Sequence, residues 1–220
     1  MCKFKIVKSL IKKKNPVIVE VGAHYGEDSV KLLDVCGATV YCFEPDPRNI
    51  AIIKQYIGTK IKLYEYAVSN KNGEAEFYQS YNPDVTPKML KKYSWIDKKD
   101  YIKLKLNSSG ASSLKSGYRF VSDHITVNTI RLEDWIIKHK ILSIDLLWID
   151  VQGAECEVIE GLGKKNECVQ YVVMEYGETN NYDGALTREQ TIKLMKNNDF
   201  ILMTKFSSSS DRGDLWFRHE

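Results

Sequence analysis

The sequence has few of the features that mark secreted or membrane proteins. Its five cysteines are odd in number and scattered, without a CxxC or Cys/His spacing: Cys2, Cys36, Cys42, Cys156 and Cys168. A disulfide framework or a zinc site is therefore not expected. No segment free of Asp, Glu, Lys and Arg exceeds nine residues, whereas a membrane helix needs ~20 mostly apolar residues. We expect a soluble protein without a membrane span.

We also expect no secretory signal at the N-terminus. Six lysines fall within residues 3–14, but no apolar segment with a cleavage site follows them. A cytoplasmic location fits this and the cysteine usage best. The lysines alternate with apolar residues at helix-like spacing, which predicts an amphipathic helix over residues 1–15 with a solvated lysine face.

Strong net charge is missing as well. The chain has 32 basic and 29 acidic residues, a net charge of +3, whereas nucleic-acid-binding domains usually have clustered basic residues and a pI above about 9. We expect no nucleic-acid partner. The 220 residues suit one domain, since domains typically have ~100–200. No internal repeat with a period of ~20–50 residues is visible.

The first strong structural signal is the β-branched run Pro16–Val21, closed by Gly22. It predicts a strand buried on both faces, as in parallel sheets. A helix over 27–35, a strand over Thr39–Phe43 and a helix over 47–57 follow. Two successive βα units predict right-handed crossovers and a parallel sheet.

The rest of the chain continues this alternation. A turn at 70–73 predicts a hairpin between the strands Ile61–Val68 and Ala75–Tyr78. Residues 80–118 lack periodicity and predict an insertion or lid. The last two strands must pair antiparallel, because a parallel crossover needs a dozen or more residues. Further strands are expected over 124–130, Ile144–Asp150, Val169–Glu175, Phe200–Thr204 and Leu215–Arg218, and helices over 131–139, Glu155–Leu162 and 187–197.

Four predicted strands end in acids: Glu20, Glu44, Asp150 and Glu175. Because ligands of open α/β sheets bind at the carboxyl ends of the strands, these acids predict a polar crevice there. The glycine loop, residues 22–26, lets backbone N–H groups at a helix N-terminus approach a ligand. It matches neither the dinucleotide fingerprint nor the P-loop. A nucleoside without pyrophosphate fits best, with Glu44 on its ribose hydroxyls.

Five blocks of the sequence resemble the successive motifs of one family. They are Val19-Glu20-Val21-Gly22-Ala23-His24-Tyr25-Gly26-Glu27-Asp28-Ser29, Phe43-Glu44-Pro45-Asp46-Pro47, Tyr66-Ala67-Val68-Ser69, Ser112-Ser113-Leu114, and Ile149-Asp150-Val151-Gln152-Gly153-Ala154-Glu155 followed by Gly161. Their order and spacing over residues 17–177 are similar to those of FkbM-type S-adenosylmethionine-dependent methyltransferases. Gln152 departs from the pattern, because the family commonly has Glu there.

The resemblance implies an α/β fold of the Rossmann-like class I methyltransferase type, with a mostly parallel seven-stranded sheet and an antiparallel C-terminal strand. It also implies S-adenosylmethionine as cofactor and S-adenosylhomocysteine as product. By position, the glycine loop would approach the amino-acid part of the cofactor, Glu44 the ribose, and Ala67 and Val68 the adenine. The expected cofactor contacts are Glu20, Gly22, Ala23, His24, Gly26, Ser29, Glu44, Pro45, Ala67, Val68, Asp150 and Gln152.

Asp150 is the leading catalytic candidate. The resemblance places it facing the methyl group, where a carboxylate can accept a proton from an attacking hydroxyl. His24 and Glu175 are further candidates, and His124 is a weaker one. Asp150, Glu155 and Glu175 could instead group around Mg²⁺, but Glu155 can also satisfy the N-terminus of its own helix. A metal is therefore not favoured.

The resemblance implies hydroxyl acceptors on sugars, glycans or polyketide-like small molecules. We expect an O-methyltransferase acting on a sugar or glycan, with residues 80–118 as the acceptor-binding insertion. The lysines of the insertion could attract an anionic carrier. Two alternatives remain open: a small-molecule N-methyltransferase, and a non-catalytic nucleoside- or partner-binding module. The expected acceptor contacts are Ser112, Ser113 and Tyr176, with Tyr81, Tyr93, Trp95 and Tyr101 as neighbouring aromatics.

Overall fold

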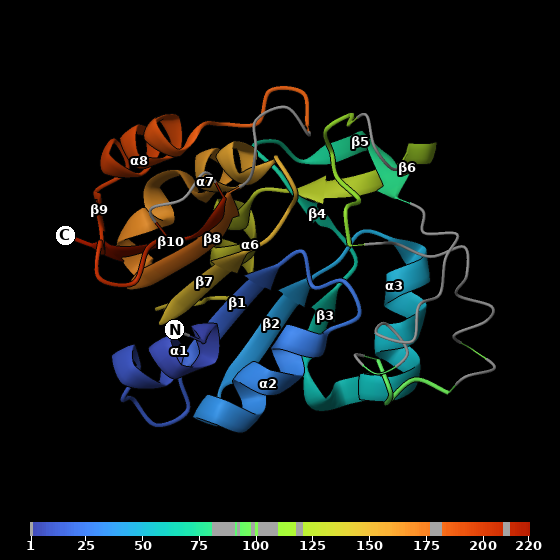
Figure 1. Cartoon of the computed structure of the whole chain (residues 1–220), viewed down its shortest axis with the longest axis horizontal. Coiled ribbons are helices and arrows are strands. Elements are labelled where there is room, and N and C mark those ends of the chain that lie inside the picture. The colour runs from blue at the N-terminus through green and yellow to red at the C-terminus, as the bar shows by residue number, and fades with distance from the viewer. Residues whose placement is uncertain are drawn as a thin grey trace.

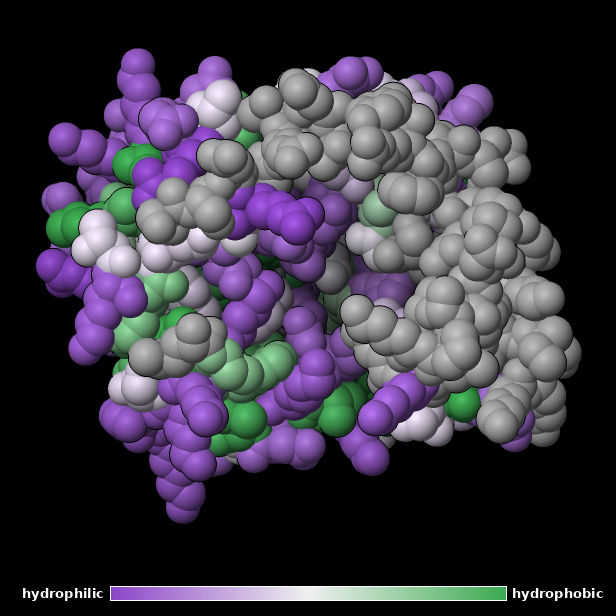
Figure 2. All heavy atoms as spheres, in the orientation of Figure 1, coloured by the Kyte–Doolittle hydropathy of each residue, from purple (hydrophilic) through white to green (hydrophobic). Residues whose placement is uncertain are grey.

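The protein is described by a computed structural model (Figure 1). It describes residues 2–80, 91, 93–97, 100, 110–117, 121–176, 182–208 and 212–220. Much of the predicted insertion, including Tyr81 and Tyr101, lies outside these residues. Hydrophilic side chains cover most of the described surface on the face shown in Figure 2, with hydrophobic ones scattered among them. Within the described chain, we find no helix with the length and apolar character needed to span a membrane.

The main sheet has seven strands in the order β3-β2-β1-β7-β8-β10-β9. Six run parallel, and β10 pairs antiparallel with both of its neighbours, for example Phe217 opposite Leu202 and Trp216 opposite Val173. The predicted sheet with its antiparallel last strand is therefore confirmed. The strands are β1 (Val17–Val21), β2 (Thr39–Phe43), β3 (Lys62–Tyr64), β7 (Leu146–Ile149), β8 (Tyr171–Tyr176), β9 (Phe200–Leu202) and β10 (Gly213–His219).

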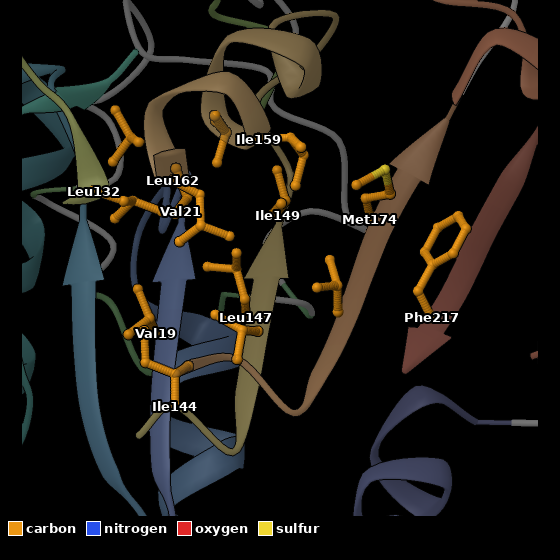
Figure 3. Packing of buried hydrophobic residues seen from close by; sticks show 14 of the residues in the cluster. Val19, Val21, Leu132, Ile144, Leu147, Ile149, Ile159, Leu162, Met174 and Phe217 are labelled. Carbon is orange, nitrogen blue, oxygen red and sulfur yellow. The ribbon is translucent and has the colours of Figure 1, made fainter. Parts of the chain in front are cut away.

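Side chains alternate between the two faces of this sheet. On one face, Val19 and Val21 of β1 pack with Leu147 and Ile149 of β7 and with Met174 of β8 (Figure 3). This cluster is covered by α6 (Leu132–Lys138), α7 (Glu155–Leu162) and α8 (Arg188–Lys196). Because both faces are buried, the strands read as the continuous apolar runs seen in the sequence.

The opposite face is covered by α1 (Lys3–Leu10) and α2 (Glu27–Cys36). In Figure 1, α2 lies in front of β2. The N-terminal helix buries Ile6 and Val7, and the ring of Phe4 stacks on Trp148 at 5.6 Å. At the edge of the sheet, α3 (Pro47–Ile52) continues as a π-helical turn over 53–57 and a 3₁₀ turn over 58–60. A further 3₁₀ segment spans 163–168.

The region after β3 differs from the prediction. The expected strand over Ile61–Val68 is interrupted: β3 belongs to the main sheet, whereas β4 (Ala67–Val68) belongs to a second sheet with the order β4-β6-β5. The predicted hairpin is wrong, because β5 (Gly73–Ser80) pairs antiparallel with β6 (Val121–Ile130) rather than with the preceding strand. That long pairing provides many more ladder hydrogen bonds than two-residue β4, which pairs with the other edge of β6.

Candidate active site

A cavity of about 280 Å³ opens at the carboxyl ends of the central strands. Strand order reverses at β1, which pairs with both β2 and β7, so the loops after these strands diverge and leave a crevice. The structure brings most of the predicted site residues together around it. Those lining the cavity are Glu20, Gly22, Ala23, His24, Glu44, Pro45, Ala67, Val68, Ser112, Asp150, Gln152 and Glu175.

Gly22 allows the end of β1 to approach β7 closely. Its φ is +88°, and a Cβ built there would lie 1.9 Å from the carbonyl oxygen of Asp150. Its N–H donates to the carbonyl of Phe43 at 3.0 Å, and the N–H of Ala23 donates to the same oxygen at 3.1 Å. A side chain at 22 would separate these strand ends, so glycine sets the shape of the cavity floor.

Gly26 and Ser29 lie behind the cavity lining. Gly26 has a φ of +79° at the N-cap of α2, and a Cβ there would lie 2.5 Å from Ile57 Cδ1. Ser29 is fully buried and donates a hydrogen bond to Glu20. Both residues, predicted to contact the cofactor, thus support the residues that line the cavity.

Glu44 ties the loop after β2 to the glycine loop. Its Oε2 accepts from the backbone N–H of His24 at 2.7 Å, and its Oε1 accepts from the N–H of Asp46 at 2.9 Å and from Asn49 Nδ2 at 3.2 Å. Burial raises the pKa of Glu44 to about 7, although these hydrogen bonds and the nearby His24 act to lower it. A carboxylate has about four lone-pair positions, so Oε2 keeps one for a ligand.

The opposite end of the cavity holds a pair of acids from adjacent strands. Asp150 follows β7 and Glu175 lies on β8, and Gln152 donates to both of them. Burial and the charge of Glu175 raise the pKa of Asp150 to about 8. In its ionised form, which becomes the major one above about pH 8, such a carboxylate is a stronger base than an ordinary one.

Other predicted candidates lie elsewhere. The hydroxyl of Ser113 donates to the carbonyl of Val151 at 3.3 Å, and the side chain is 1% exposed. Tyr176 belongs to the main core cluster, with its hydroxyl 3.5 Å from the carbonyl of Ser208. His124 is exposed on β6. None of the three lines the cavity, whereas the neighbouring Ser112 does.

The described part of the cavity lining is strongly acidic. It contains six carboxylic acids and no lysine or arginine. Among the residues that the structure describes, no three His, Cys, Asp or Glu side chains are grouped so as to hold a metal ion. Glu155 instead accepts a hydrogen bond from the N–H of Gly153 at 3.1 Å, at the start of α7. The six acids are Glu20, Glu27, Asp28, Glu44, Asp150 and Glu175.

Several lining residues were not identified from the sequence as site residues. Phe77 comes from β5 in the second sheet and Trp148 from the apolar core of β7, so neither has a local signal. Asn49 lies on α3, five residues after Glu44, and no motif in the sequence indicates that it belongs to a site. Tyr93, expected near the acceptor, does line the cavity and packs edge-on against Tyr25 at 5.2 Å.

The buried acids make fold stability depend on pH. Burial raises the pKa values of four acids above the value of about 4 that they have in the unfolded chain. The pKa is raised to about 7 for Glu44 and Glu155 and to about 8 for Asp150, and that of Glu20 is also well above its usual value. Between about pH 4 and pH 8 the folded state therefore binds more protons than the unfolded state. The free energy of unfolding consequently falls as the pH rises toward 8. We expect the unfolding temperature to drop by roughly 5 °C or more from pH 6 to pH 9.

Differential scanning calorimetry across this pH range checks that expectation. Glu20→Gln should weaken the pH dependence, because it removes one of the buried groups. Glu74→Gln, on the exposed part of β5, should leave it unchanged. A stability that is flat or rises from pH 6 to pH 9 would contradict the assignment of raised pKa values.

Comparison with known proteins agrees with this geometry. The sequence matches the methyltransferase FkbM domain over residues 20–202. The 2-O-methyltransferase NoeI of Sinorhizobium fredii is 33% identical over 218 residues, covering 97% of this chain and 83% of that protein. A TehB-like SAM-dependent methyltransferase from Corynebacterium glutamicum superposes with a TM-score of 0.52 at 9% identity, over 99% of this chain and 86% of the other.

An rRNA methylase from Streptococcus thermophilus superposes similarly, with a TM-score of 0.51 at 7% identity over 98% of this chain and 93% of the other. At such low sequence identity, these two structures show only that this chain shares their fold. The fold is that of the class I S-adenosylmethionine-dependent methyltransferases. The chain belongs to the FkbM methyltransferase family, because the matched region covers most of its length. It is therefore an enzyme, a methyltransferase of the S-adenosylmethionine-dependent class, as the sequence predicted.

Proposed function

We propose that this enzyme transfers the methyl group of S-adenosylmethionine to a hydroxyl group of a sugar or glycan. The observation that carries the proposal is the acidic cavity, whose described lining has six carboxylic acids and no lysine or arginine. The sulfonium and ammonium groups of S-adenosylmethionine would favour the ionised forms of these acids, whereas the phosphate groups of NAD and ATP would be repelled by them. The name of the relative from Sinorhizobium fredii, a 2-O-methyltransferase, supports an oxygen acceptor.

The end of the cavity near β2 fits the nucleoside. Glu44 keeps one acceptor position for a ribose hydroxyl, and Asn49 Oδ1 is buried beside it without a partner among the described residues. An unpaired buried amide oxygen costs roughly 1–3 kcal/mol, so a second ligand donor here would be favourable. Ala67, Val68 and Phe77 add apolar surface for the adenine ring.

The glycine loop fits the amino-acid part of the cofactor. Glu20 is 2% exposed, and burial raises its pKa well above the usual value. The hydrogen bond from Ser29 lowers this pKa by a smaller amount. An ammonium group beside Glu20 would stabilise its ionised form by direct charge pairing. His24 lies in the same loop with its backbone fixed by Glu44.

Methyl transfer then takes place at the Asp150 end. When bound, S-adenosylmethionine supplies a methyl group that forms a bond to the acceptor oxygen as the carbon–sulfur bond breaks and sulfur keeps the electron pair. Asp150 would accept the proton of the acceptor hydroxyl. Ser112, Leu114 and Tyr93 also line the cavity and offer polar and apolar contacts suited to a sugar.

Two measurements test the proposal. Calorimetry should show saturable binding of S-adenosylhomocysteine and no comparable binding of NAD or ATP. Incubation with isotope-labelled S-adenosylmethionine and a panel of neutral sugars, amino sugars and glycosides, followed by tandem mass spectrometry, should place the label on a hydroxyl oxygen. Label on nitrogen would instead support an N-methyltransferase, and cofactor binding without labelling of any acceptor would support a binding module.

A further inference from the structure

One side chain connects the two acids at the acceptor end of the cavity. Nε2 of Gln152 lies 2.5 Å from Asp150 Oδ1 and 3.4 Å from Glu175 Oε2. The NH₂ group has two hydrogens, so one amide can donate to both carboxyl groups. Without a donor between them, like charges on adjacent strands would repel each other.

A tyrosine fixes this amide from its other side. The hydroxyl of Tyr182 lies 3.1 Å from Gln152 Oε1 and 3.0 Å from the carbonyl oxygen of Ala111. Only one of the two amide orientations presents oxygen to the tyrosine and NH₂ to the acids. Gln152 also has a left-handed backbone, with a φ of 55°. Such a conformation is unfavourable for a residue with a Cβ and persists where surrounding contacts enforce it.

We propose that Gln152 is a positioning residue, which holds the carboxyl groups of Asp150 and Glu175 together so that Asp150 is oriented to accept the proton of the acceptor. This deepens the proposed function and rests on it. Tyr182 acts one step further out: its single hydroxyl hydrogen is shared between the amide oxygen of Gln152 and the carbonyl oxygen of Ala111, in the wall that also contains Ser112.

The charges around Asp150 explain why a neutral donor suits this position. Glu175 on β8, Glu155 on α7 and Glu20 on β1 all interact with it electrostatically. Burial and the charge of Asp150 raise the pKa of Tyr182 to about 12, so the phenol stays neutral. Lys3 on α1 is the cation among these groups, and it also pairs with Asp214 at 2.7 Å. A glutamate at 152 would add another negative charge, whereas Gln stabilises the ionised form of Asp150 without one.

Gln152→Met and Gln152→Glu test this role. Methionine keeps the length but removes the donor, and glutamate replaces the donor with a charge. In the complex with S-adenosylhomocysteine, the Asp150 carboxyl carbon, followed by ¹³C NMR, should titrate at higher pH in the order wild type, Met, Glu. The acid limb of the kcat–pH profile should move in the same direction, with kcat on that limb falling about tenfold for each unit of pKa shift. Acceptor KM should change less than about threefold, because substrate-binding contacts remain.

Two further variants keep the test decisive. Tyr182→Phe should shift the titration the same way by a smaller amount, since it releases the amide without removing it. Gln55→Met, which removes an exposed amide bond to Asp100, is the matched control and should change nothing. If Gln152→Met leaves both the titration and the kcat–pH profile as in wild type, the positioning role is wrong. A wild-type protein that methylates no acceptor would refute the proposed function, while the NMR titration would still report on Gln152.

Discussion

Replacing Asp150 with Asn is expected to lower kcat by roughly 10²–10⁴-fold, the usual contribution of a general base. Asn has nearly the same size and keeps an oxygen that Gln152 can reach, so the cavity should keep its shape. It cannot accept the hydroxyl proton. Affinity for S-adenosylhomocysteine should change less than about tenfold, because the proposed nucleoside contacts come from Glu44 and its neighbours rather than from Asp150. Single-turnover kinetics at saturating cofactor, together with calorimetry, would measure both quantities.

Asp34→Asn is the matched control for this substitution. Asp34 is exposed on α2 and does not line the cavity, so both kcat and affinity should match wild type. Near wild-type turnover in Asp150→Asn at saturating acceptor would show that Asp150 is structural. His24 would then be the better candidate, since its ring lies in the cavity lining next to Glu27.

Glu44→Ala is expected to cost roughly 2–4 kcal/mol of cofactor affinity, or about 30- to 1,000-fold in Kd. It removes the proposed acceptor for the ribose and also the bond that fixes the N–H of His24 in the glycine loop. Two hydrogen bonds to a charged acceptor are each worth ~1.5–3 kcal/mol, and water replaces part of them. Calorimetric titration with S-adenosylhomocysteine measures the loss directly.

The control for this change is Glu74→Ala on the exposed part of β5, which should leave the affinity unchanged. The unfolding temperature of Glu44→Ala must also be recorded, because the carboxylate accepts bonds from Asp46 and Asn49 as well. A folded Glu44→Ala variant with wild-type affinity would place the ribose elsewhere in the cavity.

Most of the main sheet was predictable because its signals are local. β1 and β7 are buried on both faces, so their sequences are continuous apolar runs. The antiparallel pairing of β9 and β10 follows from their short separation. The division of Ile61–Val68 between two sheets was not predictable, because it depends on β6, which is more than fifty residues away in the sequence. A local turn pattern cannot show which distant strand will provide the longer ladder.

The sequence by itself determined the family, the succession of strands and helices along most of the chain and the acids at the strand ends, because each depends on short motifs or local runs of residues. Only the tertiary structure decided which candidates share one cavity. It brought Asn49, Phe77 and Trp148 to the lining from separate elements, and placed Ser113 and Tyr176 outside it. It also placed Tyr182 against Gln152, thirty residues apart. Such contacts arise from the packing of distant segments, which no local periodicity or motif spacing encodes.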